Sequence, residues 1–415
     1  MIARGTVFLL VLSMSFLSAP TLHDFGGASI NVYDVLLLWC LGVAGVIVCM
    51  TGRVKVSMGA SIVPLLIHYA LLVVLPVVGF IVYQYDIGNV TSSIRFAFIV
   101  SSISALWLMV AGKEEPVMRA LMCALFIGLL GNFSLASLQH AEFFGMIQGE
   151  YLPHYWYEDM VENPKFNNPG RAVGFFSGPN QLGWFGVVGA LLFMGRIIAY
   201  REKSWSDITI FAVSVAIVIL STSRSAFISL AVSAITVTAL SYAAKQRVGR
   251  ITFIAICISG ASVYGLLTSG IGGYVVRGLT AVAHMDLASD GSFAARSQYA
   301  WQNAIQAFES YPLGYGGDPV SIAGTIDSGW LSYLVQGSMM LVTSFLLLIV
   351  SGVYRSFQIL IHSDKVERRW MAIACMGLSV SVALGSVVLS PFHYLHVMVP
   401  FIIMYLTVAQ KESII

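Results

Sequence analysis

The chain has 415 residues, of which 58% are hydrophobic and 10% are charged, and its formal net charge is +2. Soluble domains carry about 25% charged residues, so this composition excludes an ordinary soluble protein and indicates an integral membrane protein. A membrane span needs roughly 20 apolar residues, so the length accommodates about a dozen spans and argues against a separate soluble domain.

Apolar runs bounded by charges and turn residues predict twelve transmembrane helices. They lie near residues 6–20, 34–50, 58–80, 95–111, 117–138, 181–199, 206–221, 226–243, 251–268, 329–352, 371–389 and 397–410. The first run resembles a signal peptide, but Leu17 fits poorly at the −3 position of a cleavage site after Ala19, so we expect a retained helix. The predicted fold is an all-α polytopic membrane protein, with residues 1–415 forming a single membrane domain.

Lysine and arginine are distributed unequally between the two sides of this arrangement. One side carries 16 of them, and the opposite side carries six, namely Arg95, Lys165, Arg171, Arg224, Arg277 and Arg296. Cytoplasmic loops carry an excess of Lys and Arg, which makes the side with 16 cytoplasmic. Both termini are therefore expected in the cytoplasm.

Two loops on the outer side are long, residues 139–180 and residues 269–328. The first places several tyrosines and a tryptophan among acidic residues, a composition that suits the membrane interface. The second lies between the ninth and tenth spans and is the longest polar interruption of the chain. Within it, residues 292–309 show apolar residues at three- and four-residue spacing, which predicts an amphipathic helix on the membrane surface or over the bundle.

Five of the six outer cations are arginines, whose planar guanidinium matches phosphate oxygens, so we expect an anionic ligand on this side. Arg224 is the most informative, because it lies in a short connection between two apolar runs. A lone charge at membrane depth costs at least ~2.5 to 3.5 kcal/mol on insertion, which predicts a partner for Arg224. The alternative, for Arg224 and also for Arg95, Arg277 and Arg296, is a side chain that extends to the lipid headgroups.

Arg171 precedes a Gly-Pro-Asn turn that opens the sixth predicted helix, and we expect Asn180 of this turn to cap that helix. Three glycines then share one helix face. A strip without side chains allows another helix or a lipid tail to approach closely. The three are Gly183, Gly186 and Gly189.

Candidate general bases also lie on the outer side. Asp327 immediately precedes a span, where it could accept a proton from a substrate or, alternatively, cap the helix. The other candidates are Asp290, Asp318, His140, His154, His284, His393 and His396. The chain contains no DxD pair, phosphate loop, HExxH or zinc-spaced Cys/His cluster, so we expect neither a cofactor nor a metal.

Four stretches, taken in their order and spacing, resemble the O-antigen polymerase and O-antigen ligase superfamily, over about residues 171–340. They are RAVGFFSGPNQLG from Arg171, STSRSAFISL from Ser221, ARSQYAWQNAIQAFESYPLGYGGDP from Ala295 and DSGWLSYLVQGSMM from Asp327. The resemblance implies a GT-C-like fold. It also implies a glycosyltransferase that moves glycan from undecaprenyl diphosphate to an acceptor sugar at the outer face of the inner membrane.

The resemblance assigns Arg171, Arg224 and Arg296 to the diphosphate, and Arg277 is a further candidate from its place in the same loop. Asp327 is the expected base, acting with Arg224 and Arg296 in catalysis. The implied partners are the lipid-linked oligosaccharide, membrane lipids, a chain-length regulator protein and a flippase, with no nucleic acid.

Ligases resemble one another in having His-Asn where this chain has Asp327 and Ser328, and that His is their proposed base. This departure favours a polymerase that joins repeat units of O-antigen or exopolysaccharide. The alternatives are a ligase that attaches polymer to lipid A-core and a flippase or transporter. A flippase should carry charges within its spans, whereas here they lie mostly in loops.

Overall fold

The computed structural model describes residues 2–16, 21–25, 28–51, 59–84, 98–102, 104–105, 114–143, 171–176, 178–200, 204–246, 296–316, 319–324 and 326–410. The long helices are α1 (Ile2–Ser15), α2 (Val32–Thr51), α3 (Val63–Tyr83), α5 (Glu114–Phe143), α7 (Pro179–Ala199), α8 (Trp205–Ser221), α9 (Arg224–Ala243), α15 (Gly329–His362), α16 (Val366–Gly385) and α17 (Leu395–Ala409). The short elements are β1 (Thr21–Phe25), β2 (Ala28–Asn31), η1 (Ala60–Ile62), η4 (Arg296–Ala300), α13 (Trp301–Ser310), α14 (Val320–Ala323) and η5 (Pro391–His393).

Ten of the twelve predicted spans fall on helices of the described residues. The predicted span 251–268 lies outside the described residues, and of the span 95–111 only part is described. Five of the described helical stretches are long and apolar enough to cross a membrane. The prediction of a helical, multi-pass membrane protein is therefore confirmed, and the described part also contains an antiparallel β1–β2 hairpin that the sequence did not predict.

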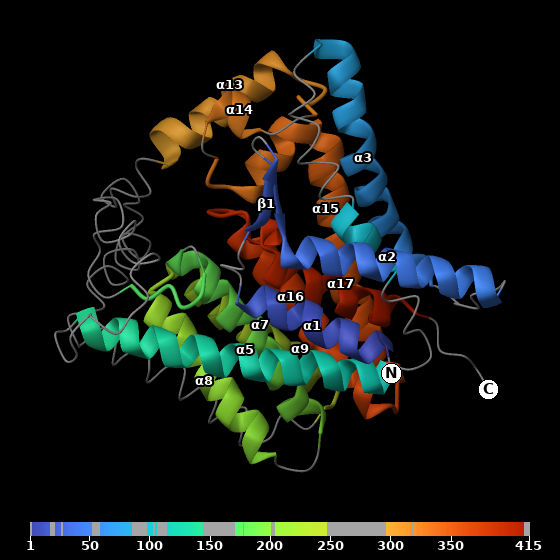
Figure 1. The fold of residues 1–415 in the computed structure, drawn as a ribbon, viewed down its shortest axis with the longest axis vertical. Helices are drawn as coiled ribbons and strands as arrows, with labels where there is room; N and C mark the ends of the chain where they lie inside the picture. The colour runs from blue at the N-terminus through green and yellow to red at the C-terminus, as the bar shows by residue number, and fades with distance from the viewer. Residues whose placement is uncertain are drawn as a thin grey trace.

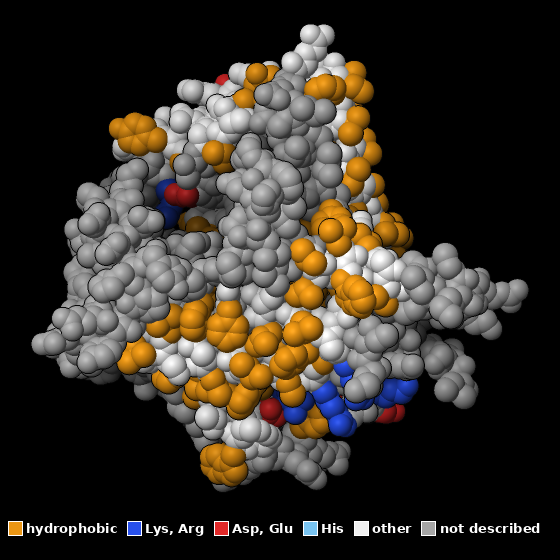
Figure 2. All heavy atoms as spheres, in the orientation of Figure 1, with side chains coloured by type: hydrophobic (Ala, Val, Ile, Leu, Met, Phe, Trp, Pro, Cys, Tyr) orange, Lys and Arg blue, Asp and Glu red, His pale blue; other side chains and the backbone are white. Residues whose placement is uncertain are grey.

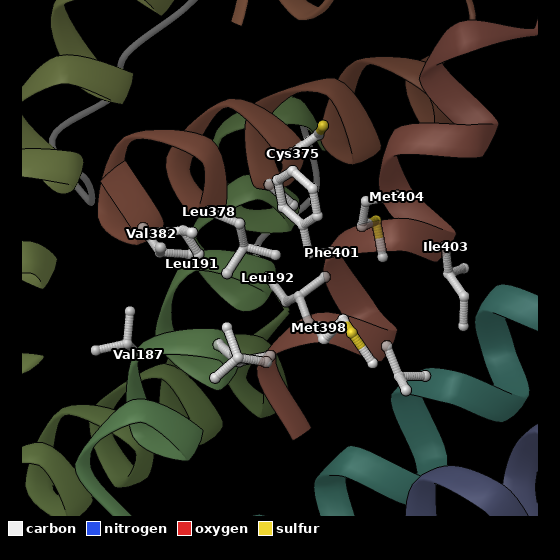
Figure 3. Packing of buried hydrophobic residues seen from close by; sticks show 14 of the residues in the cluster. Val187, Leu191, Leu192, Cys375, Leu378, Val382, Met398, Phe401, Ile403 and Met404 are labelled. Atoms are coloured by element: carbon white, nitrogen blue, oxygen red, sulfur yellow. The ribbon is translucent and has the colours of Figure 1, made fainter. Parts of the chain in front are cut away.

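Helix α7 is the centre of the bundle, with α8, α9, α16 and α17 packed against it (Figure 1). Of its most apolar stretch 89% is buried, against 28% of the stretch that contains α3. Figure 3 shows how the side chains of three helices meet in the core. They are Val187, Leu191 and Leu192 of α7, Cys375, Leu378 and Val382 of α16, and Met398, Phe401, Ile403 and Met404 of α17.

The three glycines of α7 let α8 and its end approach the helix backbone. A Cβ atom on Gly183 would lie 2.7 Å from Oγ of Ser221, and one on Gly186 would lie 2.8 Å from the carbonyl oxygen of Ser214. On Gly189 it would lie 2.6 Å from Oγ of Ser214. The predicted close packing along this face is confirmed, and the neighbour is a helix.

The outer surface of the bundle is apolar. On α3, for example, Leu66, Val74 and Ile81 are 57%, 52% and 68% exposed. Figure 2 shows apolar side chains in a band across one face of the molecule, with basic side chains gathered below the band. Such a band is what a surface in contact with lipid requires, since hydrocarbon solvates apolar side chains as well as a protein core does.

Candidate functional site

Four helices begin in one region of the molecule. Helix α9 begins directly after α8 ends, and the approach to α7 is hydrogen-bonded to that corner. The Phe176 ring, just before α7, lies 4.6 Å from the His396 ring in the first turn of α17. The first residue of α15, Gly329, donates its N–H to the carbonyl oxygen of Leu389, close to α17, at 2.8 Å. Because each helix N-terminus is the positive end of a helix dipole, this region favours anions.

Arg171 lies before α7 and faces the corner between α8 and α9. Its Nε donates to the carbonyl oxygen of Ser221 at 3.5 Å, and its Nη2 donates to Oδ1 of Asn180 at 3.3 Å. The N–H of Ala172 donates to the carbonyl oxygen of Leu220 at 3.0 Å. The guanidinium is therefore held at the end of α8.

The expectation that Asn180 caps α7 is wrong. Gly178 occupies the N-cap position and Pro179 the first turn, where its fixed φ and missing N–H suit the helix start. The side-chain oxygen of Asn180 instead accepts hydrogen bonds from Arg171 and from Oγ of Ser223, the latter at 3.0 Å. Asn180 thus joins the start of α7 to the start of α9.

Arg224 is the first residue of α9 and is half-buried. The corner before it turns sharply at Thr222, which has a φ of +48°. Ser223 is the N-cap residue, yet its side chain makes no capping hydrogen bond, because its hydroxyl contacts Asn180 and lies 3.3 Å from Oγ of Ser225. The side chain of Ser223 therefore accepts from no backbone N–H of the first turn of α9, where the cationic Arg224 lies.

Arg296 and Asp327, which are 31 residues apart in sequence, form an ion pair with Nε 3.2 Å from Oδ2. Their side chains are 26% and 37% exposed, so the pair is open to solvent or a ligand. The alternative role of Asp327 as a helix cap is not what the structure has, because Ser328 caps α15 by accepting from the N–H of Leu331 at 3.4 Å. Figure 2 shows basic and acidic side chains together in a hollow below α13.

Tyr394, the N-cap residue of α17, lies near enough to Asp327 to sense its charge and was not singled out in the sequence. Burial, with a smaller contribution from the negative charge of Asp327, raises the pKa of Tyr394 to about 12. Its hydroxyl therefore stays protonated near neutral pH and can donate a hydrogen bond. The ring stacks on that of His396 at 5.5 Å, which orients it.

The helix predicted over residues 292–309 is present in its described part as the π-helical turn η4, which begins at Arg296, followed by α13. Residues 311–316, the glycine-rich segment that follows α13, pack on α15. The N–H groups of Tyr315 and Gly316 donate to the carbonyl oxygens of Val335 and Gln336 at 2.8 and 2.7 Å.

These bonds are possible because α15 is broken at Gly337 and Ser338, which have non-helical backbone angles. The break frees carbonyl groups that a continuous helix would have used. Ser338 adds a hydrogen bond from its Oγ to the carbonyl oxygen of Pro312 at 2.7 Å. The segment therefore ties α13, and with it the Arg296 end of the outer loop, to the helix that follows Asp327.

The remaining candidates are distributed more widely. Arg277, Asp290, Asp318, His154 and His284 lie outside the described residues. His140 lies on α5, His393 in η5 and the buried His396 in the first turn of α17. Across the described part of the chain, no three His, Cys, Asp or Glu side chains are grouped as a metal ion would need.

A family model described as O-antigen ligase matches residues 209–337, and no curated protein matches the chain. The matched part contains the α8–α9 corner with Arg224, the Arg296–Asp327 pair and the part of α15 that ends at its break. Arg171 precedes the matched residues. Over these residues the protein is similar to the O-antigen ligase family, which confirms its resemblance to the O-antigen polymerase and O-antigen ligase superfamily.

Proposed function

We propose that this protein is a polysaccharide polymerase that transfers glycan from undecaprenyl diphosphate to an acceptor sugar at the outer face of the bacterial inner membrane. The proposal rests on two observations, arginines at the adjoining starts of α7 and α9 and an arginine paired with the carboxylate that precedes α15. Arg171 and Arg224 lie at the starts of α7 and α9, and Arg296 lies against Asp327.

In the proposed reaction, a hydroxyl of the acceptor sugar attacks the anomeric carbon of the donor. The new glycosidic bond forms as the bond between that carbon and the diphosphate oxygen breaks. The electron pair leaves with undecaprenyl diphosphate, and Asp327 accepts the hydroxyl proton. Negative charge grows on the diphosphate, so arginines and helix N-termini positioned there stabilise the transition state more than the bound substrate.

The arginines thereby take the part that a metal ion has in other glycosyl transfers. Each hydrogen bond to a charged group contributes about 1.5 to 3 kcal/mol. The lipid diphosphate is itself an activated leaving group, so no nucleotide is needed in this step. A flippase would deliver the donor to the outer face, and a chain-length regulator would act on the growing polymer.

A ligase that attaches finished polymer to lipid A-core is the second candidate, because the matching family model is described as O-antigen ligase. Both enzymes break the same bond and differ in the acceptor. The polymerase is favoured by Asp327 and Ser328, which stand where ligases of this superfamily resemble one another in having His-Asn.

The test is a gel of glycans extracted from cells that lack the protein, complemented with the wild type, Arg224→Ala or Arg296→Ala. We expect single-repeat glycan in the deletion strain, a restored ladder with the wild type, and no ladder with either variant, although both accumulate in the membrane. Long polymer that stays on the carrier identifies a ligase. Lipid-linked units retained on the cytoplasmic face identify a flippase, and normal ladders from both variants contradict the proposed site.

A further inference from the structure

We propose that Asn132 and Gln139 of α5 are positioning residues that set the place of Arg171 at the site. Both residues are buried, at 0% and 6% exposure, in a helix that is itself apolar enough to cross a membrane. Polar side chains at membrane depth are costly and generally meet a specific partner. Here the partner is the backbone of the loop that carries Arg171.

Gln139 satisfies three backbone groups of this loop. Its Oε1 accepts from the N–H groups of Val173 and Gly174 at 3.0 and 2.9 Å. Its Nε2 donates to the carbonyl oxygen of Gly174 at 3.3 Å. Because an irregular loop leaves its peptide groups without helical partners, these bonds replace the ones that the backbone would otherwise lack.

Asn132, two helical turns earlier on α5, holds the next peptide. Its Oδ1 accepts from the N–H of Phe175 at 3.0 Å. Its Nδ2 donates to the carbonyl oxygens of Ser15, at the end of α1, and Gly128, at 2.7 and 2.9 Å. Since both donors are used, the amide is fixed with its oxygen toward the loop.

The loop that carries Arg171 lies directly on the side-chain amides of Asn132 and Gln139. Gly174 has a φ of +59°, and a Cβ atom there would lie 2.5 Å from Oδ1 of Asn132. On its other side the loop is bonded to the end of α8 through Arg171 and Ala172. The position of the Arg171 guanidinium therefore depends on α5 as well as on the α8–α9 corner.

The inference deepens the proposed function and rests on it, because a placed Arg171 matters only if it engages the diphosphate. It assigns α1 and α5, which precede the matched residues 209–337, a part in building the site. Misplacing a substrate-binding group by about 1 Å can cost about 10²-fold in rate, so loss of either amide should weaken transfer strongly.

The experiment uses the full-length protein purified in detergent, with amide-resolved hydrogen exchange and a transfer assay on a lipid-diphosphate-linked repeat unit. Gln139→Met removes all three bonds at similar volume, whereas Gln139→Glu keeps the oxygen that accepts from Val173 and Gly174. Asn132→Leu removes the bond to Phe175. Leu125→Ala, a buried change two turns before Asn132 on α5, controls for lost stability alone.

We expect Gln139→Met to speed exchange at the amides of Val173 and Gly174 and to raise the donor KM, with Gln139→Glu intermediate in both. Asn132→Leu should act likewise at Phe175, and Leu125→Ala should leave these amides and the KM unchanged. Unchanged exchange in the Gln139 and Asn132 variants overturns the inference, and so does faster exchange with wild-type KM when Arg171→Ala itself loses transfer.

Failure of the proposed function gives a different result. Full transfer by Arg171→Ala would show that the diphosphate does not need this arginine. The exchange pattern would still report whether α5 places the loop, because it does not depend on turnover.

Discussion

The Arg296–Asp327 pair unites two candidate residues whose relation no local pattern could indicate. Both side chains are about a third exposed, so the pair contributes little to stability, on the order of 0.2–1 kcal/mol. This small contribution agrees with the role toward a ligand that we propose for the pair. Tyr394, half-buried and protonated near neutral pH, adds a hydrogen-bond donor near Asp327.

At the residue scale, we predict that Asp327→Asn lowers the transfer rate by about 10²- to 10⁴-fold, the range for loss of a general base. The melting temperature should change little, because the ion pair is partly exposed and contributes little to stability. Transfer assays and thermal unfolding in detergent measure the two effects. Glu309→Gln, an exposed acid at the end of α13, is the control and should keep the wild-type rate. A rate loss that follows the loss of folded protein would contradict a chemical role.

At the element scale, α7 depends on glycines rather than on large side chains at its contact with α8. A Cβ atom on Gly186 would meet the backbone carbonyl of Ser214 at 2.8 Å, and a carbonyl cannot rotate away as a side chain can. Since α7 carries Asn180 and follows Arg171, a shift of this contact would also move the site.

We predict that Gly186→Ala lowers the free energy of unfolding by about 1–3 kcal/mol, as overpacking does in cores, and that Gly186→Leu prevents accumulation of folded protein. Thermal unfolding and the yield of monodisperse protein measure this. Gly42→Ala on α2 is the control, because nothing lies within 4 Å of its added methyl group. Equal melting temperatures for Gly186→Ala and Gly42→Ala would contradict the proposed close contact.

The break in α15 at Gly337 and Ser338 is the place of a second close contact between elements. Gly314 has a φ of +91°, and a Cβ atom there would lie 2.7 Å from both the carbonyl oxygen of Gln336 and the Cα of Gly337. Glycine is thus required twice over, for its backbone angle and for the close approach.

We predict that Gly314→Ala detaches the glycine-rich segment from α15 and abolishes transfer, while α15 itself stays helical. Trypsin added from the outer side should then cut faster after Arg296. Gly324→Ala is the matched control, because Gly324 also has a positive φ, +68°, but faces open space. If both variants are cut equally fast, backbone strain alone explains the effect.

At the scale of the whole molecule, the unequal distribution of Lys and Arg predicts the orientation in the membrane. We expect alkaline phosphatase to be active when inserted within the loop 269–328 and inactive when fused after residue 245 or residue 410, because the enzyme folds only outside the cytoplasm. Green fluorescent protein should give the reverse pattern. Active phosphatase after residue 410 would contradict the placement of the C-terminus and of the candidate site.

The sequence by itself determined the class of protein and the approximate helices. Apolar runs of about 20 residues can satisfy their backbone in lipid only as helices, so hydropathy alone predicts them. The helix ends were less well predicted: α15 continues to His362, past the expected end at residue 352. Arg224 and Asp327 were singled out by their positions beside predicted spans, and the family resemblance assigned the arginines, Arg171 and Arg296 included, to the diphosphate.

Only the tertiary structure decided which of these residues meet. Arg296 is paired with Asp327. Asn180, which the sequence predicted as a cap, links α7 and α9. Asn132 and Gln139 hydrogen-bond the backbone of the loop that carries Arg171. The physical reason is that a hydrogen bond has a range of about 3 Å and needs the right direction. Distances of this size between residues far apart in the chain follow from how helices pack, and residue types in sequence do not contain them.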